Sequence, residues 1–180
     1  MANNDVGLIK RASDYGAYMG AVLCIIFFAV VYSTIIPQLS ILAIALIAVI
    51  PFFLFWMMRR TRKVSGAYTR LSALWMFGIL TFIFGGIILA AVVYIYLQFI
   101  DTDFISRQLG AAIEIYKQNP ELVNSETLDT LTKIYESGQV PTAIQSAMSS
   151  LWSVSFFGSV LSLIEAAIVT AASKNNIGEK

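Results

Sequence analysis

The stretch from Leu71 to Ile100 decides the fold, and it reads LSALWMFGILTFIFGGIILAAVVYIYLQFI. From Leu74 to Leu97 it contains no charged residue. A helix of about 20 apolar residues crosses the hydrocarbon core of a bilayer, so this stretch predicts a membrane-spanning helix. It begins beside a group of arginines and ends in an acidic segment. The other apolar runs are therefore interpreted relative to it.

The composition of the whole chain is that of a membrane protein. Of its 180 residues, 58% are hydrophobic and 13% are charged, whereas soluble domains are about half apolar and a quarter charged. The absence of histidine excludes histidine-based metal sites and catalytic triads. The single cysteine, Cys24, lies in an apolar run and cannot form a disulfide within the chain.

Three further apolar runs are long enough to span a membrane, and Pro51 predicts a kink in the second of them. The expected spans are residues 15–36, 40–58, 72–100 and 148–172. The predicted fold class is therefore an all-α polytopic protein with four transmembrane helices. We treat residues 1–180 as a single membrane domain.

Residues 101–147 form an insertion of a different composition between the third and fourth spans. This insertion contains seven acidic residues but only three basic ones, Arg107, Lys117 and Lys133. The apolar periodicity predicts two amphipathic helices, and hence a soluble helical hairpin. Such a pair is too small to be stable alone, so we expect its apolar faces to rest on the bundle, the membrane surface or a partner.

The basic residues predict the orientation of the chain in the membrane. A short loop after the second span carries Arg59, Arg60, Arg62, Lys63 and Arg70, and basic residues in short loops stay in the cytoplasm. With both termini also inside, nine of the 12 basic residues are cytoplasmic. This predicts a bacterial inner-membrane protein with an extracytoplasmic insertion.

The basic loop also has two functional interpretations. It can bind the head groups of anionic membrane lipids, or it can dock a cytoplasmic partner. An orientation signal alone explains the same residues equally well. Nucleic-acid binding is excluded because the chain has no basic domain with a reading element.

Small residues in the spans predict close contacts between helices. In lipid, glycines let two helix backbones approach closely. These contacts would join helices of this chain or of a partner. The predicted packing positions are Gly16, Gly20, Gly78, Gly85, Gly86 and Gly158.

Glu165 is the one carboxylate inside a predicted span. Such residues face a bundle interior or water and mark ion or proton paths. Thr81 and the carbonyl freed by Pro51 fall at a similar depth, so we consider a small buried polar cluster of these three residues. The alternative is that Glu165 reaches down to interfacial water or to Lys174.

No catalytic residue, cofactor site or metal site is predicted. The serines of the fourth span have no histidine or lysine beside them to act as a base, and no glycine-rich phosphate loop is present. Asp101-Thr102-Asp103 resembles the start of a calcium loop, but the required glycine and distant glutamate are missing.

The exit of the third span and the last span resemble a known family. The first motif is Phe99-Ile100-Asp101-Thr102-Asp103-Phe104, and the second runs from Ser162 to Ile168 as SLIEAAI. Together they resemble the domain-of-unknown-function-4199 family of small four-span inner-membrane proteins of Bacteroidota. This chain departs from the family at Thr102, where proline is usual, and at Glu165.

The resemblance implies no activity, and it implies an accessory role near membrane glycosyltransferases. Our first hypothesis is therefore a non-enzymatic membrane protein that assembles with itself or with a membrane-protein partner. The alternative is a small transporter or proton-coupled subunit that uses Glu165.

Overall fold

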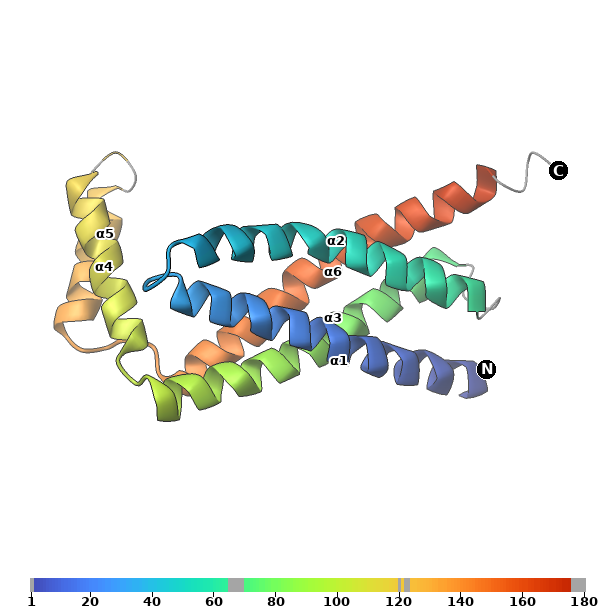
Figure 1. The fold of residues 1–180 in the computed structure, drawn as a ribbon, viewed down its shortest axis with the longest axis horizontal. Helices are drawn as coiled ribbons and strands as arrows, with labels where there is room; N and C mark the ends of the chain where they lie inside the picture. Colours follow the sequence, from blue (N-terminus) through green and yellow to red (C-terminus); the bar gives the residue numbers. More distant parts are fainter. Residues whose placement is uncertain (1, 65–69, 120, 122–123, 176–180) are drawn as a thin grey trace. The chain divides into compact units, whose positions relative to one another are not determined.

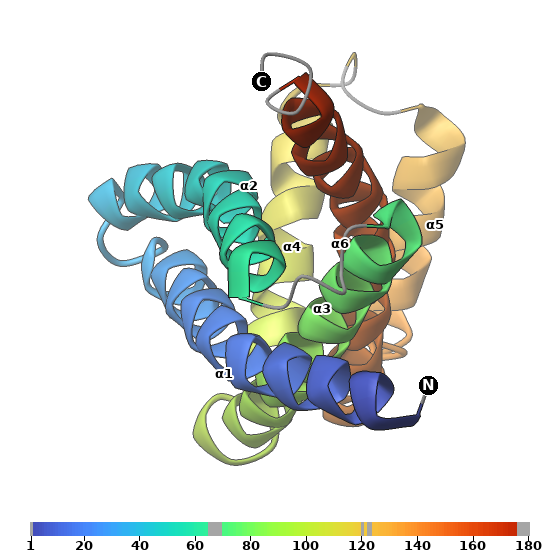
Figure 2. The same ribbon diagram turned by 90° about the vertical axis from the view of Figure 1, so that its right-hand side faces the viewer.

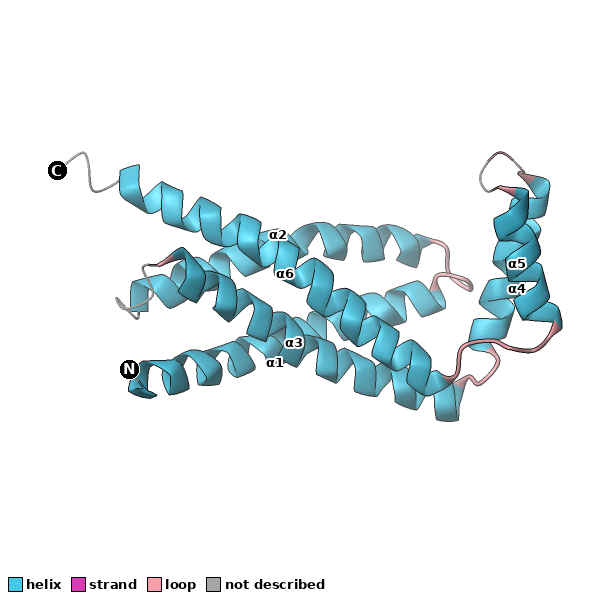
Figure 3. Cartoon of the chain, turned by 180° about the vertical axis from the view of Figure 1, so that it is seen from behind, coloured by secondary structure: helices cyan, strands magenta, loops and turns pink. Residues whose placement is uncertain are grey.

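The computed structural model describes residues 2–64, 70–119, 121 and 124–175 (Figure 1). These residues form helices and loops, with no strand among them (Figure 3). In chain order the elements are α1 Ala2–Tyr32, α2 Gln38–Val64, α3 Leu71–Ile95, the π-helix η1 Tyr96–Ile100, α4 Phe104–Gln118, α5 Ser125–Glu136 and α6 Ala143–Asn175.

The predicted all-α fold with four transmembrane helices is confirmed. Four stretches are long and apolar enough to cross a membrane, and they run Gly7–Tyr32, Gln38–Arg62, Leu71–Ile100 and Ala143–Ala172. The helices α4 and α5 are not among them and form the hairpin between the third and fourth spans. Pro51 lies inside α2, which bends partway along its length (Figure 2).

The helices and the predicted spans differ in extent, because a helix can continue past the hydrocarbon of the membrane. The first helix runs from Ala2 to Tyr32, whereas the first span was predicted over residues 15–36. Just after this end, the hydroxyls of Ser33 and Thr34 donate to the carbonyls of Val30 and Val31, at 2.6 and 3.0 Å. These bonds satisfy carbonyls that a helix end leaves free.

The prediction of a basic loop is wrong for Arg59, Arg60, Arg62 and Lys63, which lie in the last turns of α2. Arginine and lysine are good helix formers, so α2 continues past the apolar residues. Arg70 precedes α3, and residues 65–69 of the predicted loop lie outside the described part of the chain.

The last span begins at Ala143 because Thr142 and Gln145 form a capping box. The Thr142 N–H donates to the Gln145 side-chain oxygen at 2.9 Å, and the Gln145 N–H donates to the Thr142 hydroxyl oxygen at 3.3 Å. Reciprocal bonds of this kind satisfy two donors that a helix start leaves free. The helix therefore starts before the predicted residue 148.

The chain divides into two compact units, residues 1–90 with 149–180, and residues 91–148. The first unit contains α1, α2 and most of α3 and α6. The second contains the end of α3, η1, α4, α5 and the start of α6.

In the first unit, α1 crosses α3 where glycines on both helices meet. A methyl group added to Gly85 would lie 3.1 Å from the Gly20 nitrogen and 3.2 Å from the Gly16 oxygen. One added to Gly16 would lie 2.5 Å from the Phe84 Cβ. The two backbones are therefore in contact, as expected for small-residue packing in lipid.

The helices α3 and α6 also pack through small residues. Gly78 lies against the Ser162 side chain, and Gly158 lies against the Phe82 ring. A methyl group on Gly86 would reach Leu151 at 3.0 Å. All six predicted packing glycines thus make contacts inside the bundle.

The second unit is a hairpin with its own end signals. Tyr135 of α5 packs on Gly110 of α4. The Asn124 side chain accepts the Thr127 N–H at the start of α5, and Gly138 has a φ of 68° just after its end. A positive φ favours glycine, so Gly138 ends α5.

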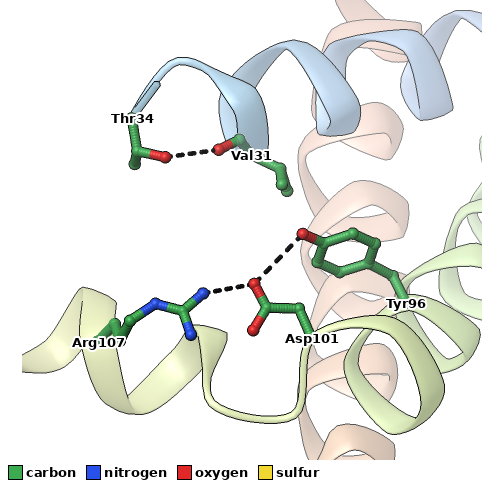
Figure 4. A network of polar contacts seen from close by, with 5 residues as sticks. All are labelled: Val31, Thr34, Tyr96, Asp101 and Arg107. Carbon is green, nitrogen blue, oxygen red and sulfur yellow. Dashed lines mark hydrogen bonds and ion pairs between the residues drawn. The ribbon is translucent and has the colours of Figure 1, made fainter. Parts of the chain in front are cut away.

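Asp101 joins the π-helix to α4. Its carboxylate accepts hydrogen bonds from the Arg107 guanidinium and, at 3.4 Å, from the Tyr96 hydroxyl (Figure 4). The bond to Asp101 raises the pKa of Arg107 above its ordinary value.

Candidate functional site

Glu165 is buried in the first unit, on the face of α6 that is covered by the bundle. It is 8% exposed, and among the described residues it forms no hydrogen bond or ion pair. The charged form of such a side chain costs about 2.5–3.5 kcal/mol at a helix centre on insertion scales. Its position in an apolar span therefore makes Glu165 the first candidate for a functional site.

Thr81 and Pro51 are the other members of the predicted polar cluster. Thr81 is fully buried on α3, and its hydroxyl donates to the Phe77 carbonyl of the same helix at 2.8 Å. No hydrogen bond in the described part of the chain joins Glu165 to Thr81 or to the turn before Pro51. The structure thus places two buried polar residues in one bundle, and their pairing stays a prediction.

Two other buried hydroxyls of the first unit were not proposed as site residues from the sequence. Ser162 precedes Glu165 by three residues on α6, and Thr61 lies near the end of α2. Both are almost fully buried, and neither hydroxyl has a hydrogen-bond partner within the part of the chain that the structure describes. Ser162 and Glu165 are three residues apart, and this spacing in the sequence indicates that they share one helix face. The sequence contains no comparable indication that Thr61 is buried.

Arg62 differs from the other residues of the basic cluster because its side chain contacts another helix. Its guanidinium donates to the Val169 carbonyl of α6 at 2.6 Å, whereas Arg59, Arg60 and Arg70 are exposed. The Lys63 side chain lies outside the described residues. Arg62 therefore ties the last turns of α2 to α6.

Replacing Arg62 by glutamine is expected to lower the free energy of unfolding by about 1–2 kcal/mol, because a charge-assisted hydrogen bond is lost. The matched control is Arg59→Gln, which removes the same charge from an exposed position and should change stability by less than about 0.5 kcal/mol. Detergent-titrated unfolding in mixed micelles measures both. Equal losses would show that the bond to Val169 does not contribute.

Metal binding has no support in the described part of the chain, where no group of three acidic or cysteine side chains is close enough to hold an ion. In the segment that resembles the start of a calcium loop, Asp101 accepts a hydrogen bond from Arg107.

Four apolar helices, three of which meet through glycines, with a polar hairpin between the last two, define a small four-span membrane protein. The chain belongs to the family described as protein of unknown function DUF4199, whose family model matches residues 14–170. No curated protein and no solved structure matches the chain.

Proposed function

We propose that this protein is a non-enzymatic subunit that assembles with a membrane-protein partner or with a second copy, through its hairpin. The observation that carries the proposal is that α5 contains no buried residue. In the spans, exposed apolar side chains meet hydrocarbon. The hairpin lies outside the spans, so its exposed apolar side chains need a protein surface to cover them.

The apolar stripe of α5 is only half covered by α4. Leu128, Leu131 and Ile134 are half-buried, and Ile113 is the one buried residue of α4. A helix of 12 residues is marginal by itself, so a partner that covers this stripe would stabilise it. The acidic side chains Glu126, Asp129 and Glu136 are exposed and lie on the opposite side of α5, so the stripe itself is uncharged.

The orientation belongs to the same proposal. The ends of α2 and α6 meet through Arg62, and the start of α1 lies at this end of the first unit (Figure 1). This arrangement supports a location in a bacterial inner membrane with both termini and the arginines in the cytoplasm. The hairpin then faces the outside.

Replacing Leu131 by aspartate is expected to weaken the complex by about tenfold, because a charge enters the covered stripe. The measurement is recovery of the full-length protein with its partner from native membranes in a mild detergent or nanodiscs. Thr130→Asp is the matched control, since Thr130 is exposed. A strictly monomeric protein, or equal recovery of both variants with helicity retained, would contradict the proposal.

A second candidate function is a small transporter or proton-coupled subunit, and the burial of Glu165 without an ion pair favours it. Glu165→Gln should then abolish substrate or proton flux in proteoliposomes while the fold is kept. Unchanged flux would remove this candidate.

A further inference from the structure

A cleft of about 890 Å³ opens between α1 and the second half of α2. It lies entirely within the first unit. Charged side chains line it at Arg11, Asp14 and Arg60, and aromatic ones at Tyr18, Phe53 and Trp56. The cleft thus lies where the apolar spans give way to charged residues, which is the level of lipid head groups.

The two arginines are free to bind an anion. Among the described residues, neither Arg11 nor Arg60 forms an ion pair, and Asp14 forms none either. The Arg60 guanidinium lies over the Trp56 ring, 5.3 Å from its centroid. A guanidinium held on an aromatic face keeps its N–H groups available, and their planar fork fits the oxygens of a phosphate.

The walls of the cleft suit a lipid better than a small soluble anion. Phe53 and Trp56 stack with their ring centroids 6.2 Å apart. Trp56 is 49% exposed and Tyr18 is 64% exposed. Aromatic rings with polar tips concentrate at the membrane interface, and here they would cover the upper part of an acyl chain while the arginines hold the phosphate.

The remaining polar groups indicate the kind of head group. Asp14 brings a carboxylate into the cleft beside the two arginines, and it can accept hydrogen bonds from an ammonium. Thr61 lines the same cleft, and its buried hydroxyl has no hydrogen-bond partner among the described residues. A zwitterionic head group would match both the cations and the carboxylate.

We propose that this cleft binds one aminophospholipid, with its phosphate on Arg11 and Arg60 and its ammonium at Asp14. The proposal is independent of the assembly function, because its residues lie in the first unit and the hairpin lies in the second.

The test is native mass spectrometry of the full chain released from nanodiscs of phosphatidylethanolamine, phosphatidylcholine and phosphatidylglycerol in equal parts. One phosphatidylethanolamine should be retained in preference to the other two. The Arg11→Gln/Arg60→Gln double variant should lower this retention by at least about tenfold. Asp14→Asn should remove the preference for the amine.

Arg59→Gln is the matched control, because Arg59 is exposed on the same helix but does not line the cleft; it should leave retention unchanged. Retention that is insensitive to the double variant, or that shows no preference for the amine, would overturn the proposal. Displacement of the lipid by inorganic phosphate would assign the site to a free anion and would also overturn it. Circular dichroism shows whether each variant is folded.

Discussion

Replacing Gly20 by leucine is expected to destabilise the bundle by about 2–3 kcal/mol, because overpacking a close contact costs this much. A Cβ at this position would lie 2.9 Å from the Ile88 Cβ and 3.2 Å from the Gly85 carbonyl oxygen. The Ile88 Cβ is fixed to its own backbone and the Gly85 oxygen is a backbone atom, so neither can shift without moving α3 at the crossing. Unfolding in mixed detergent micelles, followed by circular dichroism, measures the loss.

Ala21→Leu is the control for this variant, since it adds a leucine to the neighbouring position on the exposed face of α1. Its effect should stay within about 0.5 kcal/mol. Similar stability of the two variants would show that the backbones of α1 and α3 are not in contact at Gly85.

Replacing Glu165 by methionine is expected to raise the free energy of unfolding by about 1–2 kcal/mol. The reason is that a buried polar group without a hydrogen-bond partner costs free energy, and a side chain of similar length without that group does not. The same unfolding assay measures the gain. A gain in stability together with lost function would show that Glu165 serves the function although it lowers the stability of the fold.

Ile164→Met is the matched control, because Ile164 is the exposed neighbour of Glu165 on α6. It should leave stability nearly unchanged. If Glu165→Met lowered stability by 1 kcal/mol or more (about the value of one buried hydrogen bond), Glu165 would have a partner, and the predicted cluster with Thr81 would regain support.

The spans could be predicted because hydrocarbon leaves an apolar run of this length almost no structure but a helix. The residues at which the helices begin and end were harder to predict. The capping box of Thr142 and Gln145 fixes the start of α6, and apolar length alone does not report it. The continuation of α2 through Arg59–Lys63 depends on helix propensity beyond the membrane, where hydropathy gives no signal.

The candidate site was less predictable because it depends on which helices meet. The glycine spacing on α1 indicates a close contact, but it does not say that Gly85 of α3 is on the other side. The cleft brings Arg11 beside Arg60 from positions far apart in the sequence. Glu165 was recognisable from its charge, whereas the burial of Thr61 depends on neighbours that periodicity does not identify.

The side of the membrane that each segment faces is the central claim, and cysteine accessibility tests it most directly. In a Cys24→Ser background, Ser72→Cys at the start of α3 and Gln108→Cys on α4 both introduce an exposed thiol. A membrane-impermeant maleimide should label Gln108→Cys from outside the cytoplasmic membrane, and Ser72→Cys only after that membrane is permeabilised. Labelling of both positions from the same side would contradict the four-span topology.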